Sequence, residues 1–257
     1  MSQTETGPPY EPQINEVGMA DLRASLQLGW RDFLRAPLYG IGFSLVYVLG
    51  GWLIFWAVTA KGQIWWTLPA SAGFPILGPF IACGFYEISR RLEAGEPLDM
   101  AGIAGVIFRQ KDRQIPSMAA VIVIFFLFWN FLAHMIFALF MGTLTLTNAT
   151  SSFEMFQTPH GMMMLAVGSA VGALIATLLF ALTVVSLPML LDREVDFVTA
   201  MLTSLDLVKS NPLVMLSWGL LVGVALFAGM ALWFLGLLVV LPVLGHATWH
   251  LYRRALS

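Results

Sequence analysis

Residues 212–249 read PLVMLSWGLLVGVALFAGMALWFLGLLVVLPVLGHATW, a stretch of 38 residues without Asp, Glu, Lys or Arg. As one helix this stretch would be roughly 57 Å long at about 1.5 Å per residue, whereas a bilayer's hydrocarbon core is about 30 Å thick. Two membrane-spanning helices joined by a tight turn near residues 233–236 fit the bilayer better. The stretch therefore predicts a transmembrane helical hairpin.

The rest of the chain has the same apolar character. Of its 257 residues, 58% are hydrophobic and 11% are charged, whereas soluble domains average about 25% charged residues. Four further apolar runs are long enough to span a bilayer, at residues 38–60, 66–86, 117–141 and 162–191. The sequence thus predicts an all-α polytopic membrane helix bundle with six transmembrane helices in one domain, residues 21–257. The polar residues 1–20 are expected to form a disordered cytoplasmic tail.

A threefold repeat organises the six expected spans. In each copy an aspartate is followed by a proline 16 or 17 residues later, and the proline opens an apolar span: Asp21 and Pro37, Asp99 and Pro116, Asp196 and Pro212. Residues 21–38 align without gaps on residues 196–213. The repeat predicts three hairpins, at about 21–92, 98–191 and 196–254, each preceded by an amphipathic helix in the membrane interface.

The segments that precede the first and third hairpins have apolar residues at helical spacing. The expected apolar face of the first consists of Leu22, Leu26, Trp30, Phe33 and Leu34, with Arg23, Gln27, Arg31 and Arg35 opposite. The expected apolar face of the third consists of Phe197, Met201, Leu205 and Val208, with Thr199, Thr203, Asp206 and Ser210 opposite.

The second span of each hairpin contains a proline near its cytoplasmic half, at Pro79, Pro188 and Pro242. An interior proline removes a backbone hydrogen bond and kinks a helix. The kinks either shape the bundle or, around a pseudo-threefold arrangement, line a cavity or hinge.

The cations predict the orientation of the bundle. Twelve of the 13 Lys and Arg residues fall on the side that holds both termini, with Lys61 as the exception, and the loop at 142–160 contains neither residue. By the positive-inside rule, both termini are cytoplasmic. We expect a multi-pass membrane protein.

Several motifs together resemble the uncharacterised bacterial integral-membrane family DUF2189. They are GFYEISRR at 84–91, LPMLLDR at 187–193, Asn211-Pro212 with Trp218-Gly219, and PVLGHATWHLYR at 242–253. The resemblance extends from about residue 20 to the C-terminus. It implies a proteobacterial inner-membrane protein of six helices, and it supplies no catalytic residues.

His246 and His250 lie four residues apart on one expected helix, so both imidazoles can face the same way. Paired histidines can ligate zinc, copper or haem iron. No third ligand falls at an obvious spacing, and interface anchoring beside Trp249 or local hydrogen bonding is the alternative. We expect no metal and no cofactor.

Asn130 and His134 lie at mid-depth in the third span, where an unsatisfied polar group costs several kcal/mol. They are expected to hydrogen-bond to each other or to a neighbouring helix, with a substrate contact as the alternative. Glu87 and Arg91, four residues apart, predict a salt bridge at the cytoplasmic end of the second span.

The residue types and motifs that the sequence lacks limit the functions that it can have. No Asp, Glu, Lys or Arg lies in the centre of a span, which argues against a proton-driven transporter, and no catalytic fingerprint is present. The net charge of −2 does not favour nucleic acid as a partner. We expect a non-enzymatic membrane scaffold or a lipid- or protein-interaction protein, whose partners are membrane lipids and a membrane protein or a second copy of the chain. Two alternatives are a transporter-like carrier of a hydrophobic or neutral small molecule, and a metal- or haem-handling protein that uses His246 and His250.

Overall fold

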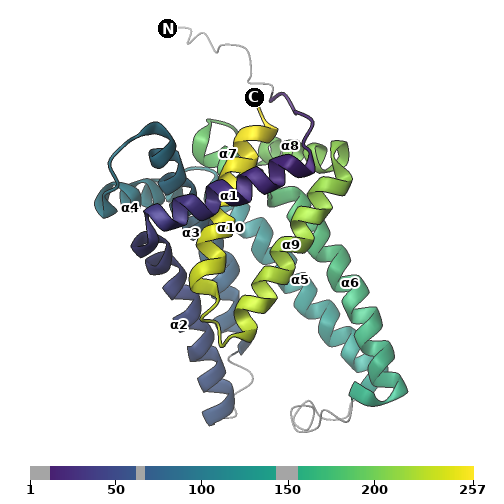
Figure 1. The fold of residues 1–257 in the computed structure, drawn as a ribbon. Coiled ribbons are helices and arrows are strands. Elements are labelled where there is room, and N and C mark those ends of the chain that lie inside the picture. Colours follow the sequence, from purple (N-terminus) through teal and green to yellow (C-terminus); the bar gives the residue numbers. More distant parts are fainter. Residues whose placement is uncertain (1–11, 62–66, 143–155) are drawn as a thin grey trace, which may run out of the picture.

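A computed structural model describes residues 12–61, 67–142 and 156–257, and these residues form helices joined by short connections. The helices are α1 (Met19–Arg35), α2 (Pro37–Lys61), α3 (Thr67–Ala94), α4 (Met100–Arg109), the 3-10 helix η2 (Gln110–Asp112), α5 (Ile115–Met141), α6 (Pro159–Thr183), α7 (Ser186–Asp192), α8 (Phe197–Ser210), α9 (Pro212–Ala231) and α10 (Leu237–Ala255). The shorter helices α1, α4, α7 and α8 gather at one end, and the long helices extend away from it (Figure 1). The predicted all-α class is confirmed.

Four segments are long and apolar enough to cross a membrane: Pro37–Trp56, Ile115–Met141, Pro159–Asp192 and Pro212–Ala231. Among the described residues, α3 and α10 are not part of this set, and the second half of each is polar. The polar half of α3 contains Glu87, Arg90 and Arg91, and that of α10 contains His246 and His250. The structure therefore shows a membrane protein with four candidate spans, while six spans in three hairpins stay a prediction.

A turn separates α9 from α10, close to the predicted position. Trp233 and Phe234 have φ angles of 55° and 64°, in a region that bulky residues rarely adopt. Trp52 of α2 donates a hydrogen bond from Nε1 to the Trp233 carbonyl at 2.9 Å, and Phe55 packs edge-on against the Trp233 ring. Contacts from α2 thus hold this turn in place.

The repeated aspartates and prolines mark helix starts. Asp99 and Asp196 are the N-cap residues of α4 and α8, where their carboxylates accept hydrogen bonds from backbone N–H groups of the first turn. Asp21, in the first turn of α1, accepts from the Gly18 N–H at 2.9 Å. The three prolines stand at the first or second position of α2, α5 and α9. Both residue types suit these positions, because a carboxylate satisfies free N–H groups and proline lacks an N–H to leave unpaired.

The face that α1 buries coincides only in part with its expected apolar face. The residues that α1 buries are Leu22, Ser25, Gly29, Asp32 and Phe33, and its main packing partner is α10. Trp30 and Leu34, expected on the apolar face of this interfacial helix, are exposed. A helix beside a bilayer can leave large apolar side chains to lipid and use small residues for close helix contacts.

Helix α8 likewise buries residues from outside its expected apolar face. It buries Ala200, Thr203, Ser204, Leu207 and Val208, although Thr203 was expected on the polar face. Its buried positions 200, 204, 207 and 208 are those of α1 at 25, 29, 32 and 33, shifted by the repeat offset of 175 residues. The repeat therefore extends to the pattern of burial.

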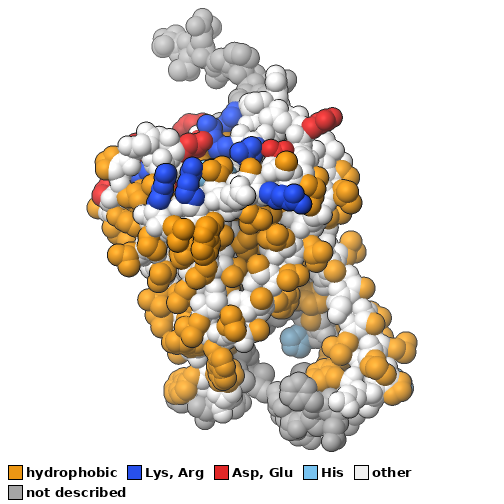
Figure 2. Space-filling view, viewed as in Figure 1, with side chains coloured by type: hydrophobic (Ala, Val, Ile, Leu, Met, Phe, Trp, Pro, Cys, Tyr) orange, Lys and Arg blue, Asp and Glu red, His pale blue; other side chains and the backbone are white. Residues whose placement is uncertain are grey.

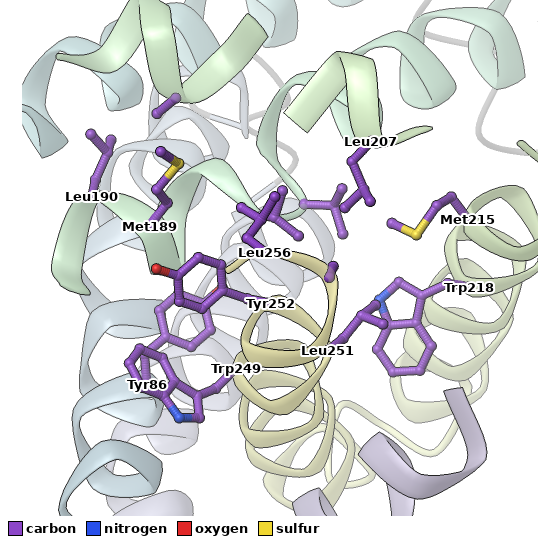
Figure 3. Close-up of a cluster of buried hydrophobic side chains, with 14 of the residues drawn as sticks. Tyr86, Met189, Leu190, Leu207, Met215, Trp218, Trp249, Leu251, Tyr252 and Leu256 are labelled. Carbon is purple, nitrogen blue, oxygen red and sulfur yellow. The ribbon is translucent and has the colours of Figure 1, made fainter. Parts of the chain in front are cut away.

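The hydrophobic core lies at the end that holds the short helices. Tyr86 of α3 stacks against Trp249 with ring centroids 6.5 Å apart, and Trp249 packs on Tyr252 at 5.6 Å. Figure 3 shows these rings beside Met189 and Leu190 of α7, with Leu207, Met215 and Trp218 on the far side of α10. Towards the other end, many large apolar side chains of α2, α5, α6 and α9 are exposed, as suits a surface that faces lipid.

Of the three prolines expected to kink helices, two lie inside a helix and one lies in a first turn. Pro79 and Pro242 lie inside α3 and α10, where α3 also contains Pro75. Pro188 lies instead in the first turn of α7, after α6 has ended at Thr183. A proline fits a first helical turn without breaking a hydrogen bond, so the chain turns before this residue.

The start of the described chain pairs with its C-terminus. Ile14 and Leu256 form an isolated antiparallel bridge, and the Asn15 N–H donates to the Ala255 carbonyl at 2.9 Å. Residues 12–18 thus differ from the disordered tail expected over residues 1–20, because backbone pairing compensates for the entropy of ordering them. Residues 1–11, and most of the expected outer loop at 142–160, lie outside the described residues.

Candidate functional site at the charged end

Charged side chains gather at the end of the molecule where the short helices lie, and hydrophobic side chains are widespread over the rest of the described face (Figure 2). This end of the molecule also contains most of the buried polar side chains, among them Asp32, Glu87, Ser89, Gln110 and His250. It is therefore the candidate functional site.

The first element of the site joins α1 to α10. Asp32 is 1% exposed, and its Oδ2 lies 2.6 Å from His250 Nε2. Burial raises the pKa of Asp32, but the hydrogen bond and charge interaction with His250 outweigh it, so the pKa falls below its ordinary value of 3.8. Asp32 is therefore ionised near neutral pH and can only accept, which assigns the shared proton to His250 Nε2.

A glycine allows this buried contact to form. A Cβ atom on Gly29 would lie 2.6 Å from the Ala247 nitrogen and 2.7 Å from the Val243 carbonyl oxygen. Only a residue without a side chain lets α1 lie this close to the α10 backbone. Gly29 thus positions Asp32 within reach of His250.

His246 has different partners from His250. Its Nδ1 lies 2.8 Å from Ser89 Oγ and 3.1 Å from the Phe85 carbonyl oxygen, both on α3. A carbonyl only accepts, so we assign a proton to Nδ1, which leaves the buried Nε2 as an acceptor without a partner among the described residues.

The two histidines therefore do not converge on one ligand. His250 turns to α1 and His246 turns to α3. Within the described ranges, no group of three or more His, Cys, Asp or Glu side chains could hold a metal ion. Each histidine instead connects α10 to a neighbouring helix.

A second network joins α3 to the start of α4. Glu87 accepts from Arg90 Nε and from Arg91 Nε, each at 2.7 Å, so the predicted Glu87–Arg91 salt bridge is confirmed. Arg91 also reaches the N-cap residue Asp99 at 3.2 Å, and Arg90 reaches Glu96 at 3.1 Å. The network thus ties the end of α3 to the N-cap residue of α4.

Asn130 and His134 bond to the backbone of their own helix. Asn130 Nδ2 donates to the Phe126 carbonyl at 2.8 Å, and His134 Nδ1 lies 2.7 Å from the Asn130 carbonyl oxygen. Within the part of the chain that the structure describes, they do not bond side chain to side chain or to a neighbouring helix, which differs from the expectation. A polar side chain in a membrane helix can satisfy itself one turn back along the chain.

An apolar cavity of about 780 Å³ lies between α5 and α6, with contributions from α3 and α9. Its walls include Phe125, Trp129, Phe137, Gly168, Gly172 and Phe227. Pro75 lines it, whereas Pro79, Pro188 and Pro242 do not. The cavity is thus separate from the three prolines expected to surround one.

Sequence reasoning missed three residues of the site: Gly29, Asp32 and Ser89. One available signal was the repeat, because Asp32 aligns with Leu207 at the offset of 175 residues. An acid that replaces a leucine on a packed face needs a buried partner.

Residues 67–192 match the DUF2189 family model, described as a predicted integral membrane protein. The resemblance to DUF2189 is confirmed over these residues, a shorter range than the expected one from about residue 20 to the C-terminus. The DUF2189 segment runs from α3 to α7 and includes the Glu87 network and most of the cavity wall. No curated protein and no solved structure gave a match.

Proposed function

We propose that this protein is a non-enzymatic, multi-pass membrane protein that acts through contacts of its charged end with lipid headgroups and with protein partners. The observation that carries the proposal is the construction of α1, α4 and α8. Each lies at the charged end (Figure 1) and exposes large apolar side chains there, with Trp30 on α1, Phe108 on α4 and Leu202 on α8 as examples. Such helices can insert apolar residues beside headgroups while their cations face the surface.

In this proposal α3 and α10 are inner spans, which makes six spans in total. α10, with 19 residues, is about 28 Å long at 1.5 Å per residue, close to the thickness of the hydrocarbon core. Its polar groups pack against α1 and α3 rather than lipid, which accounts for its low hydropathy. The basic end then faces the cytoplasm of a bacterial inner membrane, and both termini lie there.

Exposed arginines provide the attraction to anionic headgroups. Arg23, Arg31 and Arg35 on α1 are all exposed. Each cation near an anionic surface contributes roughly 1 kcal/mol, so three together can enrich anionic lipid around α1.

The proposal is tested by purification in mild detergent, followed by identification of the lipids and proteins that remain bound. A triple variant with Arg23, Arg31 and Arg35 changed to Gln should lose anionic lipid, and the matched triple change to Lys should retain it. Repeated isolation of a bare monomer would contradict the proposal, as would equal lipid content in the two triple variants.

The cavity favours a second candidate function, a carrier or binder of a hydrophobic small molecule. Its walls are almost entirely apolar, so it suits an acyl chain or a similar molecule. A Cβ on Gly168, which lines the cavity, would meet nothing within 4 Å, and Gly168→Leu should therefore fill the space without a clash. Gly223 on α9 is equally open but lies outside the cavity, so Gly223→Leu is the control.

Mass spectrometry of hydrophobic molecules extracted from the purified variants measures the effect. A bound molecule should disappear from Gly168→Leu and remain in Gly223→Leu. The same molecule at the same level in both variants would exclude the cavity as its site.

A further inference from the structure

We propose that a second pocket, formed by α3, α4, η2 and the residues that follow η2 and α7, binds a lipid headgroup with a phosphodiester and a primary ammonium. The phosphodiester would contact Arg109 and Arg113, and the ammonium would contact Gln110 and Glu194. The inference rests on the proposed membrane function and specifies one lipid class for one site.

The pocket has a volume of about 340 Å³ and a mixed lining of cations, carboxylates and apolar side chains. Arg90, Arg109 and Arg113 line it together with Glu87 and Glu194. The Glu87 carboxylate is already held by Arg90 and Arg91. The lining therefore has one more cation than carboxylates, and it offers separate partners to the two charges of a zwitterion.

Arg109 is the available cation of this pocket. Among the described residues it makes no ion pair, whereas Arg90 binds Glu87 and Glu96, and Arg113 Nη2 binds Glu194 at 3.0 Å. A guanidinium presents several N–H groups in a planar fork that matches two phosphate oxygens. Arg109, with the remaining donors of Arg113, thus fits a phosphodiester.

Gln110 provides the second, independent observation. Its side chain lines the pocket and is 2% exposed, and its Oε1 is buried without a hydrogen-bond partner among the described residues. An unpaired buried acceptor costs about 1–3 kcal/mol, and no hydrogen bond within the described residues holds this amide in place, so a rotation about its last bond can turn Oε1 to the pocket. A primary ammonium, with three donors, satisfies Oε1 and neutralises Glu194, which is 93% exposed.

The surroundings favour a lipid over a soluble ligand. Phe108, next to Arg109, is 70% exposed, and Met100 at the other end of α4 is also exposed. Such side chains at the charged end suit the boundary between headgroups and acyl chains. Val106 and Leu191 in the pocket wall can contact the glycerol end of a lipid.

The test uses the full-length protein in mixed micelles that contain phosphatidylethanolamine, phosphatidylcholine and phosphatidylglycerol, and native mass spectrometry counts the lipid retained. Phosphatidylethanolamine should be retained about tenfold more than phosphatidylcholine, whose quaternary ammonium has no N–H, because one charge-assisted hydrogen bond corresponds to about a factor of ten. Arg109→Gln should lower this retention about tenfold. Lys111→Gln, on an exposed lysine of the same segment outside the pocket, should leave it unchanged.

A second variant separates loss of the site from loss of the fold. Gln110→Leu removes the unpaired acceptor, so it should maintain or raise the unfolding temperature while it lowers phosphatidylethanolamine retention. Displacement of the lipid by an equal concentration of soluble glycerophosphoethanolamine would overturn the assignment to a lipid.

Equal retention of phosphatidylethanolamine and phosphatidylcholine would overturn the inference, as would equal effects of Arg109→Gln and Lys111→Gln. If anionic lipid is still enriched in either case, the proposed function stands and only this site is wrong. If no lipid is enriched at all, both proposals fail.

Discussion

At the scale of single residues, Asp32 is the most consequential side chain. It is the buried carboxylate that joins α1 to α10, and its partner His250 is also buried. Removal of one member of a buried pair leaves the other desolvated and unpaired, which costs more than the intact pair contributes. Asp32 should therefore tolerate substitution poorly, although it lines neither of the two pockets described above.

Asp32→Ala should destabilise the protein by about 3–5 kcal/mol, the usual cost of a broken buried pair. Asp206→Ala is the matched control, because Asp206 pairs with Lys209 on the exposed surface of α8 and should change stability by about 0.5 kcal/mol or less. Denaturant unfolding in detergent, followed by tryptophan fluorescence, measures both. Similar losses in the two variants would contradict a special role for Asp32.

The low pKa of Asp32 predicts a pH dependence. Its pKa in the folded protein lies below the ordinary value of 3.8, so the folded state favours the ionised form. This contribution to stability is complete above the unfolded pKa and disappears as the pH falls through the folded value. The stability difference between the wild type and Asp32→Asn should therefore shrink below about pH 4, and unfolding temperatures from pH 3 to pH 7 measure it. A difference that grows in acid would refute the assignment.

At the scale of elements, the contact of α1 with α10 depends on Gly29. Gly29→Ala would place a methyl group 2.6 Å from a backbone nitrogen of α10, so α1 must move, at a cost of about 1–3 kcal/mol. The matched control is Gly42→Ala in α2, where a Cβ meets nothing within 4 Å and alanine should stabilise the helix by about 0.5–1 kcal/mol. Limited proteolysis of the N-terminal segment and the unfolding temperature report the change. Equal protease resistance in the two variants would show that α1 does not need the close approach.

At the scale of the whole molecule, the proposed topology places both described ends of the chain on one side of the membrane. In a Cys83→Ser background, which removes the only cysteine, Ser257→Cys and His160→Cys introduce single thiols at exposed positions. An impermeant maleimide should label His160→Cys in intact cells and Ser257→Cys only after permeabilisation, because the arginines hold the charged end inside. Labelling of both from the same side would exclude the proposed topology.

What the sequence could predict depends on the range of the interaction. Helix starts at Asp99, Asp196 and the three prolines follow from local backbone chemistry, and apolar length identifies a membrane bundle. The buried faces of α1 and α8 could not be predicted from hydrophobicity, because lipid and protein both accept apolar side chains. The Asp32–His250 contact joins residues 218 positions apart, and one sequence holds no local signal for such a pair.

The separation of 218 positions also sets the time between the synthesis of Asp32 and that of His250. A chain grows at about 5–20 residues per second during synthesis, so α1 emerges roughly 10–40 s before His250 exists. Through that interval Asp32 lacks its partner His250, and α1 cannot occupy its final position against α10. In the proposed topology, its exposed Trp30 and Leu34 can hold α1 at the surface of the bilayer during this interval. Completion of the bundle is then a late event in biogenesis, when α10 arrives and α1 docks on it.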